Sequence, residues 1–256
     1  MAILSLKTDE SSGIQTSTAN ELSDGTAPGA IVLANGEIFP LLFDAALATL
    51  TTATGQVNNP AVSLSGYSAA NPNGLAVDIA GLDATVKVQD VGFTGFSMTD
   101  GIMAFDSTAA HNAIQTTDGR YVFLYAYAGD NNILLARAGT TGGVADPDGD
   151  LVFAVYLDTL KADGISSAVT STADVGATSA KVWMVQYQPL HNLNPNDPND
   201  VLTLGNDLGV FVNSLQSFSL ENAPSGQNLF LMFSDGTPVS GDAAIIVTGK
   251  SPANQS

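Results

Sequence analysis

The sequence predicts an all-β, β-sandwich-like fold with one short helical connection near residues 40–50. Short apolar runs rich in β-branched and aromatic residues recur along the 256-residue chain, and such runs favour strands over helices. The 25 glycines and 11 prolines fall between these runs, where they act as turn signals. Only one stretch has helical spacing, so the chain is predicted to fold mainly from strands and turns.

The clearest strands are predicted in the second half of the chain. They are the runs 121–127, 151–157, 181–187, 228–233 and 243–247. In the first run, four aromatic residues alternate with aliphatic ones, so both faces of the strand are apolar. Such strands lie at the centre of covered sheets, so we interpret the aromatic face as core rather than as a platform for sugars. The polar segment 130–132 has the composition of a hairpin turn.

The first half of the chain gives weaker signals. Residues 30–33 form a short apolar run that fits a buried strand. Residues 74–79 and 84–89 alternate apolar with small or polar positions, which predicts half-buried strands. The helical stretch is 39–50, where apolar residues recur at helical spacing behind Pro40.

Charge and hydropathy exclude several classes of protein. The chain carries 7 Lys and Arg against 25 Asp and Glu, a formal net charge of −18. This charge repels phosphate, so we expect no nucleic-acid partner. No run approaches the length of about 18 apolar residues that a membrane span needs, so we expect no membrane insertion. The 45% hydrophobic content supports one elongated β domain over residues 1–256, with a subdivision near 110–118 left open.

The absence of cysteine indicates where such a protein works. Without cysteine the chain has no disulfides and no thiolate metal site. Together with the acidity, this favours a bacterial protein exported from the cell, where bound calcium replaces covalent cross-links. We therefore expect an extracellular or cell-surface location.

One segment has the composition of a calcium site. Asp146, Asp148 and Asp150 alternate within a Pro- and Gly-containing turn, and three such carboxylates can converge on one hard cation. The segment is not an EF-hand loop, because Leu157 stands where that loop has its last glutamate. The alternative is a tight turn whose aspartates accept local backbone hydrogen bonds.

A second oxygen-rich loop covers residues 192–200. Its amides, together with Asp197 and Asp200, offer further calcium ligands. Asn, Asp and Pro are also the usual residues of ordinary loops, so this alternative stays open.

No combination of residues in the sequence predicts catalysis. The segment 66–70 resembles the Gly-x-Ser-x-Gly turn of hydrolases but lacks its second glycine. His111 and His191 are far apart and lack metal-ligand spacing. We therefore expect no enzymatic activity. A hydrolase with acidic residues in a cleft ranks below a structural module and a ligand-binding module.

Several segments together resemble a known family. They are residues 6–16, 116–125, 130–137, 148–155 and 182–191. In this order they are similar to a repeat domain of unknown function found in large type I secreted, RTX-adhesin-like bacterial surface proteins. The resemblance implies an extracellular, calcium-stabilised segment of a modular adhesin, and it supplies no catalytic residues. The chain lacks the Gly-Gly-x-Gly-x-Asp array that binds calcium in secreted toxins.

These observations predict an extracellular structural or adhesive module that is stabilised by calcium or forms fibres. Its expected partners are neighbouring repeats or identical copies, and surface polysaccharide is a further candidate. The alternative function is a glycan- or polymer-binding module that uses the exposed aromatic rings of Trp183 and Tyr187, or those of the run 121–127. Solvent exposure of those rings distinguishes the two functions.

Overall fold

The fold is built from strands, with one α-helix in the part of the chain that the structure describes. The structure, a computed structural model, describes residues 6–9, 20–24, 26–50, 60–75, 77–78, 87–106, 112–159, 179–191, 201–204, 210–215, 218–219 and 247–248. The elements are β1 (Leu6–Asp9), β2 (Glu21–Asp24), the 3₁₀ helix η1 (Pro28–Ala30), α1 (Leu41–Thr49), β3 (Ala61–Leu64), β4 (Val77–Asp78), β5 (Lys87–Phe93), β6 (Ile102–Met103), β7 (Val122–Ala126), β8 (Ile133–Ala138), β9 (Leu151–Thr159), β10 (Ser179–Gln186), β11 (Val201–Leu204), β12 (Val210–Leu215), β13 (Phe218–Ser219) and β14 (Val247–Thr248). The all-β prediction and the helix near residues 40–50 are confirmed.

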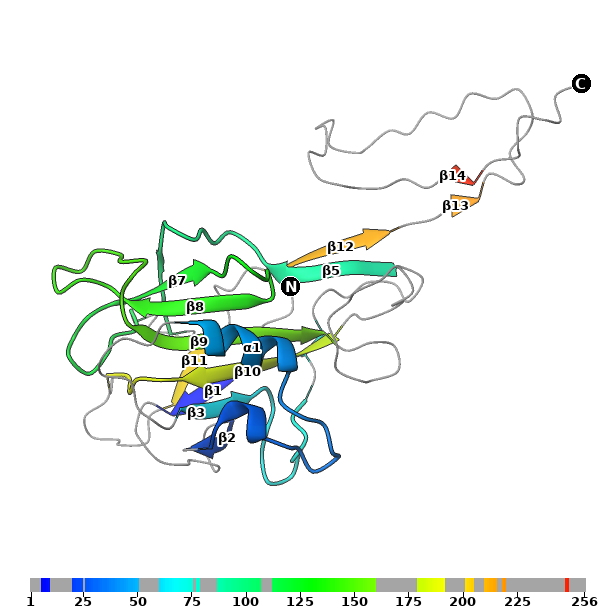
Figure 1. Ribbon diagram of the computed structural model, residues 1–256, viewed down its shortest axis with the longest axis horizontal. Coiled ribbons are helices and arrows are strands. Elements are labelled where there is room, and N and C mark those ends of the chain that lie inside the picture. Colours follow the sequence, from blue (N-terminus) through cyan, green and yellow to red (C-terminus); the bar gives the residue numbers. More distant parts are fainter. Residues whose placement is uncertain are drawn as a thin grey trace, which may run out of the picture.

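One antiparallel sheet forms the body of the fold (Figure 1). Its strand order is β2-β3-β10-β9-β8-β7-β6, and β4 also pairs with β10. Strands β7 to β10 are consecutive neighbours, so this part of the sheet is a meander. The predicted turn at 130–132 joins β7 to β8, and the Asn132 N–H donates to Asp130 Oδ1 at 2.8 Å. The predicted strands at 121–127, 151–157 and 181–187 are confirmed as β7, β9 and β10.

The remaining predicted strands have mixed outcomes. The run 30–33 contributes only an isolated bridge at Val32, because this segment belongs to a short hairpin above the sheet rather than to the sheet. The other two predictions in the first half overlap β4 and β5. The run 228–233 and residues 243–246 lie outside the described residues.

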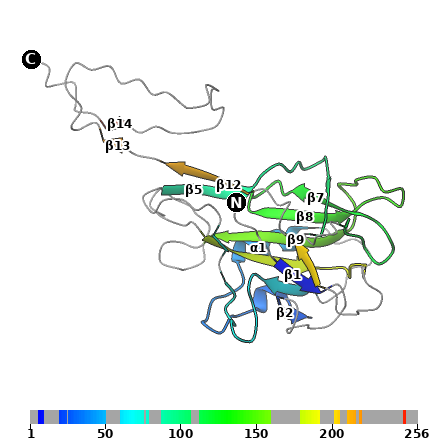
Figure 2. The same cartoon turned by 180° about the vertical axis from the view of Figure 1, so that it is seen from behind.

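Both faces of the sheet are covered. On one face, apolar side chains of β7 to β10 pack with Phe93, Ala104, Ile114 and Leu190. On the other face they pack with α1 and residues 31–39, and Figure 1 shows α1 lying over β9 and β10. The β1–β11 pair contacts β3 and the β5–β12 pair contacts β8 and β9. In both views the β5–β12 pair extends beyond the main sheet (Figure 1, Figure 2).

Strands β3 and β4 lie on the same edge of β10, and a loop interrupts them. β3 pairs with residues 183–186 and β4 with residues 179–180. At the break, the Ser65 N–H donates to the Val182 carbonyl at 2.9 Å, and Ser65 Oγ accepts from the Val182 N–H at 3.1 Å. The same hydroxyl donates to the Leu75 carbonyl at 2.7 Å. Ser65 therefore holds both ends of the 65–75 loop against β10.

Four aromatic rings fix α1 and the segment before it to the sheet. Phe39 and Phe43 stack with centroids 5.4 Å apart. Phe43 stacks on Tyr156 at 5.2 Å, and Phe39 meets Trp183 edge-on at 5.2 Å. Tyr156 and Trp183 are cross-strand partners on β9 and β10, and all four rings are fully buried. Burial of the aromatic side chains thus supplies both the core and the attachment of the helix.

We expect Phe43→Ala to lower the free energy of unfolding by about 3 to 5 kcal/mol, because it leaves a cavity between Phe39 and Tyr156. Urea unfolding followed by fluorescence measures this change. The matched control is Leu42→Ala on the same helix, whose side chain is 52% exposed and whose loss should change stability by about 0.5 kcal/mol or less. Equal effects of the two substitutions would contradict the proposed attachment.

Candidate functional site

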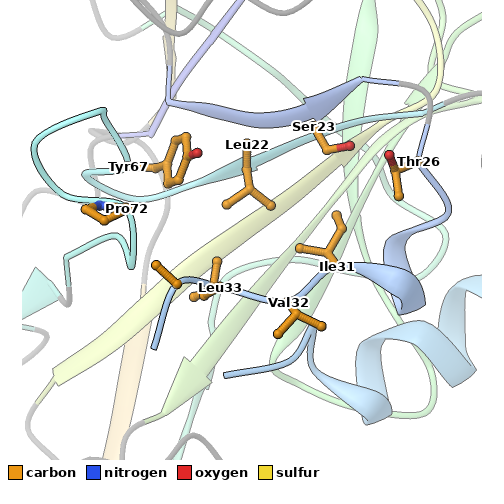
Figure 3. A pocket seen from close by; sticks show the side chains of 9 residues that line it. Leu22, Ser23, Thr26, Ile31, Val32, Leu33, Tyr67 and Pro72 are labelled. Atoms are coloured by element: carbon orange, nitrogen blue, oxygen red, sulfur yellow. The ribbon is translucent and has the colours of Figure 1, made fainter. Parts of the chain in front are cut away.

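A groove lies between β2 and residues 31–34, and we call it the β2 groove (Figure 3). Its volume is about 270 Å³. It is lined by Leu22, Ser23, Thr26, Ile31, Val32, Leu33, Ala34, Tyr67 and Pro72. Figure 3 shows side chains from β2, from the 31–34 segment and from the 65–75 loop around this space. Most of the lining residues are aliphatic, but polar atoms line the groove about as much as apolar atoms do.

One wall of the β2 groove is a short hairpin over residues 31–39. Val32 and Ile38 form its antiparallel bridge, and Gly36 turns the chain with φ +85°. A positive φ of this size is easily reached only by a residue without Cβ. The alternation of the hairpin buries Ile31 and Leu33 in the core and leaves Val32 62% exposed.

The other wall is the edge of the main sheet. In the described part of the chain, β2 pairs with β3 and is the last strand of the order. The register between β2 and β3 shifts between Glu21 and Ser23, which marks a bulge. An edge strand presents backbone N–H and C=O groups that can pair with another extended chain.

Large apolar side chains are exposed on the 31–39 hairpin and at the start of α1, and one of them, Val32, lines the β2 groove. Val32 and its bridge partner Ile38 are followed in sequence by Leu41 and Leu42, which are 68% and 52% exposed at the start of α1. A series of exposed apolar residues next to a groove is typical of an interaction surface.

The acidic turn at residues 146–150 is held by local hydrogen bonds. Asp146 Oδ1 accepts from the Asp148 N–H at 3.1 Å, and the Asp146 carbonyl accepts from the Gly149 N–H at 3.1 Å. The Asp150 carbonyl accepts from the Ala138 N–H at 2.9 Å. These contacts are those expected of a tight turn.

Arg120 connects this acidic turn to the turn over residues 116–120. Its Nη2 lies 3.0 Å from Asp150 Oδ2, and its Nε lies 2.7 Å from Asp118 Oδ2. A hydrogen bond from the Thr116 hydroxyl is the main cause that lowers the pKa of Asp118; burial opposes it, and Arg120 lowers the pKa further. A calcium ion at the three aspartates would lie near the Arg120 guanidinium. Among the described residues, no group of three His, Asp or Glu side chains is arranged to hold a metal, and the calcium site stays a prediction.

The two aromatic residues of the alternative function are largely inside the protein. Trp183 is fully buried, and its indole N–H donates to Asp158 Oδ2 at 3.2 Å. Tyr187 is half-buried, and burial together with Asp44 raises its pKa to about 12. The Trp183 ring is therefore not exposed as a glycan platform would require. Asp197 and Asp200 lie outside the described residues.

Sequence reasoning missed a buried polar contact beneath the 31–39 hairpin. Lys181 Nζ on β10 donates to Glu37 Oε2, and the two side chains are 9% and 13% exposed. Asn35 Nδ2 donates to the same oxygen at 3.3 Å. The available signal was the Asn35-Gly36 pair between two apolar runs, which is typical of a hairpin turn.

Comparisons with known proteins do not identify this chain. A scan against protein-family models, a search of curated proteins and a search of solved structures find no match. Among the helices in the described residues, none is long and apolar enough to cross a membrane.

We expect Arg120→Gln to lower the free energy of unfolding by about 1 kcal/mol, because it removes two charge-assisted hydrogen bonds that are partly open to solvent. Denaturant unfolding in EDTA measures the change. A double-mutant cycle with Asp150→Asn isolates the pair, and the effects should be less than additive. Strictly additive effects would contradict a contribution of this ion pair.

The calcium prediction is tested by thermal unfolding in EDTA, in calcium and in magnesium. Calcium alone should raise the melting temperature, because a ligand at about 100 times its dissociation constant adds about 2.7 kcal/mol. Replacing Asp146, Asp148 and Asp150 by Asn should abolish the response. A response that survives the triple substitution rules out this site, and the absence of any response contradicts calcium stabilisation.

Proposed function

We propose that the chain is a non-catalytic, extracellular structural or adhesive module that associates with identical copies through the β2 groove. The observation that carries the proposal is the position of this groove beside the edge strand β2. A strand from another copy would pair with the β2 backbone, and apolar side chains would fill the groove. This is recognition by strand addition, in which the backbone gives affinity and the pockets give specificity.

The strand directions favour a symmetric pair. Six antiparallel steps separate β2 from β6, so these two edge strands run in the same direction. Joining β2 of one copy to β6 of the next by translation would require parallel pairing. A two-fold axis instead makes β2 antiparallel to β2 of the second copy and brings both grooves together.

The second edge explains how such pairs become fibres. β6 ends the sheet on the other side in the described residues, and Ile102 on β6 and Met98 before it are exposed. A second two-fold contact between β6 strands would alternate with the β2 contact. Two different isologous contacts on one subunit produce an open chain of copies.

The net charge opposes this association. Each copy carries a formal charge of −18, so two copies repel each other at low ionic strength. Salt screens this repulsion, while burial of apolar surface persists. Association through the β2 groove should therefore strengthen as salt is added.

We expect the full chain to dimerise with rising concentration and rising salt, as measured by sedimentation velocity. Val32→Lys places a charge in the groove and should raise the dimer dissociation constant at least about tenfold, equivalent to about 1.4 kcal/mol. The matched control is Val144→Lys, because Val144 and Val32 are 64% and 62% exposed and Val144 lies outside the groove. A chain that stays monomeric, or equal effects of both substitutions, would overturn the proposal.

A further inference from the structure

We infer that Lys181 and Asn35 become joined by an intramolecular isopeptide bond, with Glu37 acting as the acid–base group. Glu37 Oε2 accepts hydrogen bonds from both Lys181 Nζ and Asn35 Nδ2. An amine and an amide that both contact one carboxylate oxygen supply the three groups needed for amide exchange. The amine is the nucleophile, the amide carbon is the electrophile, and the carboxylate transfers protons between the two nitrogens.

Lys181 is held against the sheet, close to Glu37. Lys181 is buried and lies on the same face of β10 as the buried Trp183. Its cross-strand partner Asp158 is also buried and bonds to the Trp183 indole. β10 therefore fixes the position of the Lys181 amine next to the Glu37 carboxylate.

The hairpin turn holds the amide of Asn35 in place. Asn35 Oδ1 accepts from the Glu37 backbone N–H at 3.0 Å, and the Asn35 N–H donates to Asn73 Oδ1 at 2.9 Å. Negative charge develops on Oδ1 when Cγ is attacked, and the Glu37 N–H is already directed at that oxygen. A fixed donor at a developing oxyanion stabilises the transition state.

The reaction balances without an oxidant or a second substrate. Lys181 first gives one proton to Glu37, and the resulting amine attacks Cγ of Asn35. The carboxylic acid then protonates Nδ2, the Cγ–Nδ2 bond breaks, and ammonia leaves. Glu37 takes the second proton from the new amide nitrogen. The products are a secondary amide between Nζ and Cγ, one ammonia molecule and a protonated Glu37.

The bond would connect the 31–39 hairpin covalently to β10. The chain has no cysteine, so no disulfide can make this connection. A covalent link between distant residues restricts the unfolded chain and thereby stabilises the fold. The inference depends on the contacts of Lys181 and is independent of association through the β2 groove.

A competing reaction also releases ammonia. In Asn-Gly sequences the glycine nitrogen can attack the same Cγ and form a cyclic imide. Here the Gly36 N–H donates to the Leu33 carbonyl at 2.9 Å within the turn, so this nitrogen is engaged elsewhere. An experiment must separate the two products, because both lower the mass by one ammonia.

The test is intact-protein mass spectrometry of the full chain, followed by protease digestion and fragmentation. We expect a mass one ammonia below that of the sequence and a branched peptide joining Asn35 to Lys181. Lys181→Arg and Glu37→Gln should restore the full mass. Asn35→Asp should lose one water in place of ammonia. The control Asn71→Ala, in the neighbouring loop, should keep the ammonia deficit and the branched peptide.

Two results would overturn the inference. The first is the full sequence mass for the unsubstituted chain. The second is an ammonia deficit that persists in Lys181→Arg, which would identify the cyclic imide at Asn35-Gly36. Should Lys181→Arg fail to fold, the branched peptide in the unsubstituted chain and the water loss in Asn35→Asp still decide the question.

Discussion

The contact of Phe39 and Phe43 with two aromatic side chains of the sheet determines how α1 and the hairpin before it are placed. Phe39 and Phe43 lie directly on Trp183 and Tyr156, at the centre of the longest cross-strand pairing in the main sheet. Burial of these rings holds Phe39 and Phe43 against the sheet, and the hairpin that ends at Phe39 is thereby fixed in position. The β2 groove and the contact between Lys181 and Glu37 both result from that position, since each uses residues 31–37 as one of its sides.

The core strands were predictable because a strand that is covered on both faces needs apolar residues on both faces, and this pattern is visible in the sequence. β7, β9 and β10 are apolar on both faces, and they lie at the centre of a sheet covered on both sides. The helix was predictable from a local pattern too, because apolar residues recur at helical spacing directly after Pro40. In contrast, the run 30–33 has the composition of a strand but forms a hairpin wall, since a Gly36 turn four residues after Val32 leaves no length for a ladder.

The candidate site was less predictable, because it depends on long-range neighbours. The sequence indicates a turn at 146–150, but the partner of Asp150 is Arg120, thirty residues earlier. Trp183 has the residue type of a sugar platform, and only the packing of Phe39 shows that the ring is inside. The groove joins β2, the hairpin and the 65–75 loop, which no local pattern connects. Local patterns therefore predict elements well and sites poorly in this chain.

The interruption between β3 and β4 has a consequence for how the sequence of this fold could diversify. Both strands continue on one edge of β10, and Ser65 fixes the two ends of the intervening loop. A change in the length of that loop therefore need not alter how β3 and β4 pair with β10. Pro72 faces the groove and is exposed, whereas Tyr67 faces the groove and also packs against the core. The fold thus provides a position where the shape of the groove can change while β3 and β4 keep their pairing with β10.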